Sequence, residues 1–206
     1  INSSTRMEQG RRTTRREGDQ GLKNQGDVEK RTIMRTPLFH HNHGNNIELS
    51  LDGRIAKTAW ATGNGIAFSN RPILIDERVC IQHLNVDWRG ALFFGVTSIN
   101  PAELLGTDLL ASNNPGYLIT DLPGFWVTQL PRRLVSRGNM ITFFVSQWGV
   151  GTFRVNRTNQ GSFISGVTMG VPLWAVVMLS GWRASIKFER CYDEEFHDFS
   201  FRSTTH

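Results

Sequence analysis

The feature that most constrains this chain is a series of short apolar stretches separated by turn residues. Residues 47–51 alternate apolar and polar side chains, and Asp52-Gly53 then leads into residues 54–60. An alternation with a period of two is typical of a β-strand that buries one face. Because Asp-Gly readily adopts positive φ, these two stretches are predicted to form a β-hairpin.

Further stretches of this kind follow, and glycine and asparagine clusters separate them. We predict strands over residues 65–69, 79–85, 91–98, 139–147, 151–156, 173–180 and 184–189. No long amphipathic pattern indicates an extended helix. Many short strands at fairly regular spacing are typical of an antiparallel β-sandwich, so an all-β fold of that class is predicted for residues 37–190.

Residues 99–138 differ from the rest of this region because Asn, Pro and Gly clusters punctuate them. We expect a long loop with functional residues here, since loops of this length inside a compact domain are usually functional. The aromatic side chains of Phe125 and Trp126 have a second interpretation, in which they only pack on the sandwich.

The two ends of the chain differ from its centre in charge. Residues 1–36 hold nine Lys and Arg against five Asp and Glu, whereas residues 37–206 hold 14 against 13. Residues 1–36 also have few large apolar side chains and no period, so a disordered basic tail is predicted. Residues 191–206 are acidic and aromatic. They are predicted to be a tail, a linker or a short binding motif, unless Phe196 and Phe199 pack on the sandwich edge.

Cysteine content and hydropathy indicate where the protein works. Cys80 and Cys191 are too few for a disulfide scaffold, so a reducing cytosol is the default. The chain has no apolar run of about 18 residues that would span a membrane. It begins with Ile1 and shows no signal peptide, so we expect a cytoplasmic fragment of a longer protein.

Four ordered stretches carry a family resemblance. They are FHHNHGNNI at 39–47, GIAFSNRP at 65–72, WRGALFFGVTS at 88–98 and PLWAVV at 172–177. Together they resemble the Neuralized homology repeat over residues 37–189. The chain departs from that pattern at Trp148-Gly149, where relatives tend to have an acidic or polar turn, and at residues 178–182.

The resemblance implies a concanavalin-like β-sandwich, a jelly roll related to SPRY domains. It also implies a non-catalytic role in protein binding. In Neuralized-type ubiquitin ligases these repeats recruit targets, notably the cytoplasmic tails of Notch ligands and related regulators with an Asn-x-x-Asn motif. We therefore expect a module that recruits such partners to a ligase or adaptor, at the inner face of the plasma membrane or at endosomes.

Four polar loops are predicted to form the binding surface, at residues 42–46, 70–72, 113–116 and 121–126. Asparagine amides both donate and accept hydrogen bonds, an arginine fork holds a carboxylate, and aromatic rings anchor contacts. The predicted partner-binding residues are His43, Asn45, Asn46, Asn70, Arg71, Asn113, Asn114, Asp121, Phe125 and Trp126.

Several of these residues have a structural alternative. Asn45 and Asn46 have the residue type that satisfies a turn. Arg71 has two acids nearby in sequence, Asp76 and Glu77, that would fix its side chain.

The histidines at positions 40, 41 and 43 raise the question of a metal site. On an extended chain His40 and His41 point to opposite faces, so they do not converge on one ion. Cys80, Cys191 and His83 lack ligand-like spacing. We predict a strand leading into a glycine turn at this position, with neither a metal nor a cofactor.

Catalysis is not predicted for this chain. Sandwich glycosidases need two facing carboxylates, and the Asp52-Gly53 turn would move Asp52 away from Glu48. Ser69 has no glycine elbow and no assignable base. A RING would need about eight Cys and His ligands, so any ligase activity belongs outside this sequence. Glycan binding stays open from the fold class alone.

A second class of function rests on the basic tail. Arg11, Arg12, Arg15 and Arg16 form a dense block that would attract an anionic membrane, including phosphoinositides, and the resemblance includes membrane-directed basic segments. Nucleic acid is not expected, because the block has no interleaved aromatic residues. The alternative is a solvated arm.

Overall fold

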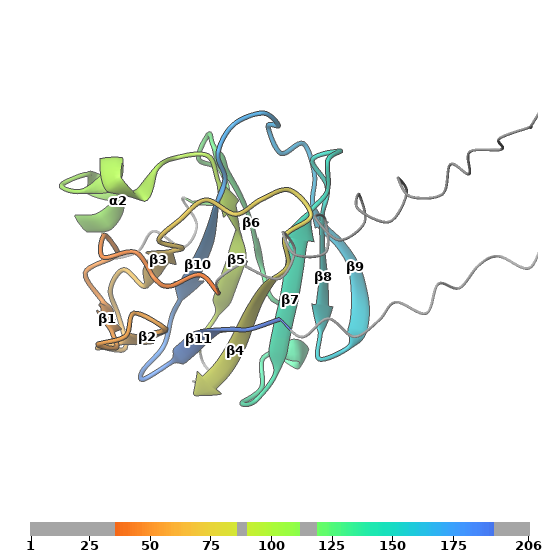
Figure 1. The fold of residues 1–206 in the computed structure, drawn as a ribbon. Helices are drawn as coiled ribbons and strands as arrows, with labels where there is room; N and C mark the ends of the chain where they lie inside the picture. The colour runs from red at the N-terminus through yellow and green to blue at the C-terminus, as the bar shows by residue number, and fades with distance from the viewer. Residues whose placement is uncertain (1–35, 86–89, 112–118, 192–206) are drawn as a thin grey trace, which may run out of the picture. The chain divides into compact units, whose positions relative to one another are not determined.

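The computed structural model describes residues 36–85, 90–111 and 119–191. Within these ranges the chain forms two antiparallel sheets (Figure 1). The seven-stranded sheet has the order β1 (Ile47–Leu49), β2 (Ile55–Thr58), β11 (Ser185–Glu189), β4 (Val79–Asn85), β7 (Met140–Val145), β8 (Gly151–Val155) and β9 (Thr158–Ile164). The four-stranded sheet has the order β3 (Ile66–Phe68), β10 (Trp174–Leu179), β5 (Leu92–Thr97) and β6 (Phe125–Gln129). The prediction of an all-β antiparallel sandwich is confirmed.

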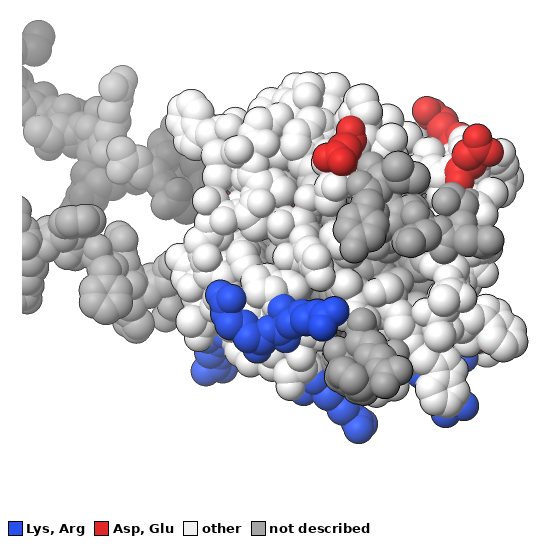
Figure 2. All heavy atoms as spheres, turned by 180° about the vertical axis from the view of Figure 1, so that it is seen from behind, with Lys and Arg blue, Asp and Glu red and all other residues white. Residues whose placement is uncertain are grey.

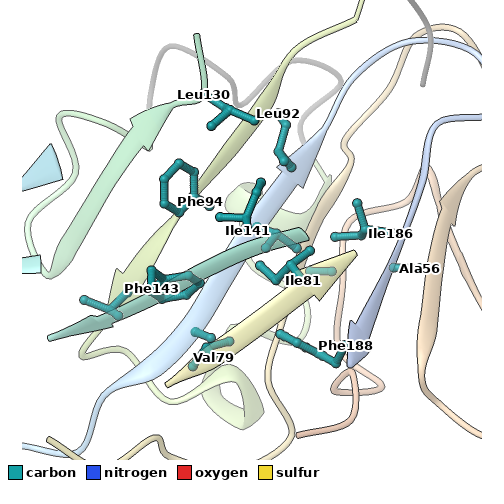
Figure 3. Packing of buried hydrophobic residues seen from close by; sticks show 14 of the residues in the cluster. Ala56, Val79, Ile81, Leu92, Phe94, Leu130, Ile141, Phe143, Ile186 and Phe188 are labelled. Carbon is teal, nitrogen blue, oxygen red and sulfur yellow. The ribbon is translucent and has the colours of Figure 1, made fainter. Parts of the chain in front are cut away.

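The main core lies between the two sheets, and alternate residues of each strand supply it. Phe94 of β5 lies with its ring centroid 5.6 Å from that of Phe143 in β7 and 5.3 Å from that of Phe153 in β8. Figure 3 shows Phe94 and Phe143 beside Ile141 and Ile81 in this core. Each such side chain contributes about 1.5–3 kcal/mol by leaving water, which is what holds the sheets face to face.

A second apolar cluster covers the outer face of the four-stranded sheet. Residues 98–111 and 119–124, called the cover below, carry the 3-10 helix η1 (Pro101–Leu104) and the short helix α2 (Asp108–Ala111). Leu104 and Leu110 of the cover are buried against Phe68 of β3 and Met178 of β10. All six residues of β10 are buried as a result, because both faces of this strand are covered.

The predicted long loop over residues 99–138 is therefore wrong in part. This stretch contains β6, the helical turns η1 and α2 and a further 3-10 turn, η2 (Arg132–Leu134). Phe125 and Trp126 are strand residues: Phe125 is buried under the cover, and Trp126 packs against the main core. The structure favours the packing interpretation for these two aromatic side chains.

Because every pairing is antiparallel, the connections gather at two ends of the sandwich. The connections β1–β2, β3–β4, β5–β6, β7–β8 and β9–β10 lie at one end, called the Arg71 end. The connections β2–β3, β4–β5, β6–β7, β8–β9 and β10–β11 lie at the other, called the Arg183 end. In Figure 1 the Arg183 end is at the bottom, where the arrow of β4 ends.

The two cysteines form a disulfide. Cys80, near the start of β4, is bonded to Cys191, which follows β11, and their Cα atoms lie 5.5 Å apart. The bond fixes the chain after β11 at the Arg71 end. Composition alone predicted a reducing cytosol and no disulfide scaffold, and no local pattern indicated this pairing, since the two residues are 111 positions apart. Within the described ranges, none of the helices has the length and apolar character needed to cross a membrane.

Candidate functional site

Three connections lie side by side at the Arg71 end. The β3–β4 connection joins the β9–β10 connection where Ile73 N–H donates to the Leu173 carbonyl at 2.7 Å. It also joins the end of β7, where Asp76 N–H donates to the Val145 carbonyl at 2.9 Å. The β7–β8 turn accepts at Gly149 O from Val167 N–H at 3.1 Å. These bonds make one continuous surface from segments up to 100 residues apart in sequence.

An arginine with a fixed orientation lies on this surface. Arg71 Nη1 donates to Glu77 Oε2 at 3.0 Å, and Nη2 donates to Oε1. Glu77 Oε2 also accepts from Leu74 N–H at 2.7 Å, and its side chain is only 5% exposed. Glu77 is one of the two acids that the sequence suggested for this role. The Arg71 side chain remains 31% exposed, so its position is set by Glu77 while part of it faces solvent.

Exposed apolar side chains lie in the same three connections as this ion pair. Leu74 and Ile75 follow Arg71 in the β3–β4 connection, and Val171 lies in the β9–β10 connection. Trp148, at the tip of the β7–β8 turn, is 79% exposed. The sequence prediction did not include these four residues. The available signal was Trp148 itself, because a large aromatic residue before a turn glycine is unusual at a solvated hairpin tip.

One of the predicted asparagines, Asn45, instead holds the cover, together with Asn42 and Asn64. Asn42 Nδ2 donates to the Pro101 carbonyl at 3.0 Å, and Asn45 Nδ2 donates to the Ala111 carbonyl at 3.4 Å. Asn64, fully buried, donates to the Leu109 carbonyl and accepts from Ile66 N–H. These residues lie along β3, because residues 40–46 run beside that strand. Their amides fasten the cover to the sandwich edge.

Asn46 and His43 belong to the same edge. Asn46 is 2% exposed, and both ends of its amide bond the backbone of Trp60, at 2.7 Å and 3.1 Å. His43 is half-buried, with Nδ1 2.9 Å from the Gly44 carbonyl. The arrangement of Asn46 favours the structural alternative, since its polar atoms are already bonded inside the fold.

The remaining predicted contact residues divide between the described and undescribed parts. Asn70 is exposed beside Arg71, and its Oδ1 accepts from Leu38 N–H at 3.1 Å. Asp121 is exposed in the cover, just before β6. Asn113 and Asn114 lie outside the described residues. The tail residues Arg11, Arg12, Arg15 and Arg16 also lie outside them, so the tail and its membrane role stay predictions.

The histidine cluster differs from the prediction in one respect. His40 and His41 do not point to opposite faces; their rings stack with centroids 4.2 Å apart. Only Phe39 forms a β-bridge here, so the local chain is not a regular strand. Burial lowers the pKa of His40, the neighbouring His41 lowers it further, and the bond with the Asn42 backbone opposes the shift. Over the ranges described, the structure has no group of three or more His, Cys, Asp or Glu side chains placed to hold a metal ion.

Comparison with known proteins agrees with the resemblance noted in the sequence. The Neuralized family model matches residues 39–190. The chain is 33% identical over 155 residues to "Protein neuralized" of Drosophila virilis, and 32% identical over 160 residues to "E3 ubiquitin-protein ligase NEURL1B" of Homo sapiens. These alignments cover 73% and 74% of the chain but only 20% and 28% of the relatives, so the chain corresponds to a fraction of their length.

Solved structures give the same result for the fold. The crystal structure of the Drosophila melanogaster neuralized NHR1 domain matches with a TM-score of 0.69 and 30% identity, covering 76% of this chain and all of that domain. The PSpry domain of TRIM65 matches with a TM-score of 0.53 at 11% identity, which shows the shared β-sandwich fold alone. On the family model and the neuralized relatives, this chain belongs to the Neuralized family and carries its homology domain.

Proposed function

We propose that this chain is a non-catalytic interaction domain whose Arg71 end binds a peptide segment of a partner protein. The observation that carries the proposal is that an oriented arginine and four exposed apolar side chains lie on connections joined by backbone hydrogen bonds. Apolar side chains of this size on a surface that also offers polar groups favour protein binding. The domain performs no reaction in this account and uses no cofactor.

The chemistry of the surface suggests how a peptide is held. Trp148, Leu74, Ile75 and Val171 would bury an apolar side chain of the partner. Arg71 and Asn70 would bond its polar groups, because a guanidinium donates and a primary amide both donates and accepts. The partner class we propose is a Notch-ligand tail or a regulator with an Asn-x-x-Asn motif. Asn70 is one of the originally predicted residues that remains well placed for this contact.

The wider role follows from the relatives. NEURL1B and NEURL3 are named as E3 ubiquitin-protein ligases. We propose that this domain recruits targets to a ligase or adaptor of that type, in the cytoplasm near membranes that carry receptor tails. Ubiquitin transfer would belong to a RING outside these residues. Membrane attachment by the basic tail and glycan binding have no supporting observation among the described residues.

Calorimetric titration of the full chain with an Asn-x-x-Asn peptide tests the proposal. Trp148→Ala should weaken binding at least tenfold, because a central aromatic anchor is lost. Trp182→Ala is the matched control, since Trp182 is also exposed but lies at the Arg183 end, and it should bind as the wild type does. Absence of wild-type binding, or equal effects of the two substitutions, contradicts the proposal.

A further inference from the structure

The charged side chains in the described connections of the Arg183 end are all positive. Five exposed arginines lie in its connections and are called the basic rim: Arg132, Arg133, Arg137, Arg157 and Arg183. The described parts of these connections, residues 59–65, 90–91, 130–139, 156–157 and 180–184, contain neither Asp or Glu nor Lys. Conversely, residues 98–124 hold Glu103, Asp108 and Asp121 without any Lys or Arg. Figure 2 shows this separation, with Lys and Arg in the lower part of the face and Asp and Glu in the upper part.

The connections that carry the rim are bonded to one another in the order of the seven-stranded sheet. Asn156 Nδ2 donates to Asn139 Oδ1 at 3.1 Å, which ties the β8–β9 turn to the β6–β7 connection. Gly138 N–H donates to the His83 carbonyl at 2.8 Å, which continues the strip to β4. Asn85 Nδ2 donates to the Arg183 carbonyl at 2.8 Å and extends it to the β10–β11 turn. The rim is therefore one strip.

Two tryptophans extend the strip. Trp182 is 55% exposed, and the Cζ of Arg183 lies 4.4 Å from its ring centroid. Trp60 is 70% exposed in the β2–β3 connection, which is tied to the β10–β11 turn by the bond from Thr58 Oγ1 to the Gly181 carbonyl. Stacking uses the flat face of a guanidinium and leaves its in-plane N–H groups for an anion.

The composition of the strip identifies the chemistry of its partner. Arginine without lysine favours planar, bidentate anions such as carboxylates, and exposed tryptophan and arginine are the residue types that dominate protein interfaces. An acidic protein segment with aromatic residues meets both requirements. Residues 192–199 of this chain, YDEEFHDF, have that composition, with four carboxylates and three aromatic side chains within eight residues.

The disulfide holds Cys191, the residue before this segment, at the end of the sandwich opposite the rim. Cys191 is bonded to Cys80 at the Arg71 end, whereas the rim lies beyond the other end of β4 and β11. Cys191 lies about 20 Å from Ser185, at the start of β11 near the rim, because the extended chain between them rises about 3.4 Å per residue. Glu195, four residues after Cys191, extends at most about 14 Å from it. The backbone of the three acids at 193–195 therefore falls short of the copy's own rim, which favours the rim of another copy.

We propose that the basic rim of one copy binds residues 192–199 of a second copy. The arginines of the rim bond Asp193, Glu194, Glu195 and Asp198, and Trp60 and Trp182 pack against the aromatic side chains of the segment. The contact is separate from the Arg71 end, so it does not depend on the proposed peptide binding. It is also distinct from membrane attachment by residues 1–36.

Sedimentation velocity on the full chain over a range of concentrations tests this proposal. The wild type should self-associate, and raised salt should weaken the association because the contacts are between charges. The rim variant R132E/R133E/R137E should lose it. The control R54E/K57E/R190E changes net charge equally, at exposed positions outside the rim, and should retain it. A wild-type chain that stays monomeric, or equal losses in both variants, overturns the proposal.

A charge exchange makes the test sharper. The variant D193K/E194K/E195K should also remain monomeric alone, because both its rim and its segment are basic. Mixing it with R132E/R133E/R137E should restore association, since each then supplies the opposite charge to the other. Failure of the mixture to associate, with both variants folded by circular dichroism, excludes direct pairing of these two sets of residues.

Substitution by lysine distinguishes carboxylate recognition from simple attraction to anions. R132K/R133K/R137K keeps the charge but loses the planar fork, so its self-association should be about fivefold or more weaker than that of the wild type. Association equal to wild type contradicts a docking mode based on bidentate arginine contacts.

Discussion

Arg71 and Glu77 form a two-point ion pair that fixes the geometry of the β3–β4 connection, with Nη1 3.0 Å from Oε2 and the Leu74 amide 2.7 Å from the same carboxylate oxygen. One buried acid thus orients both the arginine and the backbone that presents Leu74 and Ile75. This links the stability of the connection to its proposed role in binding.

Glu77→Gln should lower both the stability of the domain and its affinity for the peptide. The neutral amide cannot accept from both Arg71 nitrogens and the Leu74 amide, so we expect a loss of about 1–3 kcal/mol in the free energy of unfolding. Peptide binding should weaken in parallel because Arg71 is no longer held. Chemical denaturation and calorimetry measure the two effects. Arg54→Gln, which removes the more exposed Arg54–Asp52 pair, is the control and should change neither.

Asn64→Ala should loosen the cover. Asn64 is fully buried, and its loss leaves the Leu109 carbonyl and the Ile66 amide without their partner. Each buried polar group left unbonded costs about 1–3 kcal/mol. We expect a lower midpoint in urea and faster hydrogen exchange at amides of residues 101–111. Asn159→Ala, at an exposed position in β9, should leave both unchanged; equal effects of the two substitutions would mean that Asn64 does not hold the cover.

His83 should make stability depend on pH. Its ring nitrogens are buried and form no hydrogen bond of normal geometry with the described residues, although the Ser136 backbone lies nearby. Burial lowers the pKa of His83 below its usual 6.5, and the Ser136 backbone opposes this shift only in part. The unfolded chain therefore binds the proton first as pH falls, so stability is constant above about pH 6.5 and decreases below it.

His83→Leu should flatten this decrease between pH 7 and pH 5, and should leave stability at pH 7 unchanged or higher because a buried unbonded polar group is removed. Denaturation midpoints across that range measure the effect. Some pH dependence should remain, since the pKa of His40 is also lowered. An unaltered slope would show that His83 is not the titrating group.

Reduction of the Cys80–Cys191 bond should destabilise the domain. A cross-link that closes a loop of this length, 111 residues, restricts the unfolded chain and contributes up to about 4–5 kcal/mol in the loop-entropy description. Cys191→Ser, or reductant added to the wild type, should lower the melting temperature by similar amounts. Two reactive thiols in the folded, unreduced protein would contradict the bond.

Local sequence pattern was sufficient for the elements with a clear period. The prediction for residues 79–85 coincides with β4, and the hairpin around Asp52-Gly53 is β1 and β2. The strand β9 was missed because exposed polar residues and Gly161 interrupt its pattern. The strand β6 was missed because its beginning, Phe125 and Trp126, lies next to the Pro123-Gly124 turn and was interpreted as loop.

The site depended on contacts that a single sequence does not reveal. The connections that carry Trp148 and Leu74 lie together at the Arg71 end because β4 pairs with β7, and no local pattern specifies that register. Asn45 was predicted to contact a partner because of its residue type, but with Asn42 and Asn64 it bonds the cover, whose position is set by long-range packing. The sequence alternative for Asn45 and Asn46 was that they satisfy a turn, and the sequence alone did not distinguish that role from partner binding.

The central claim is that a partner peptide binds at the Arg71 end. Amide chemical-shift mapping of the isotope-labelled full chain during titration with an Asn-x-x-Asn peptide tests it most directly. The account predicts shifts concentrated at residues 70–77, 147–149 and 165–172. Shifts confined to the Arg183 end, or their absence at saturating peptide, would contradict it.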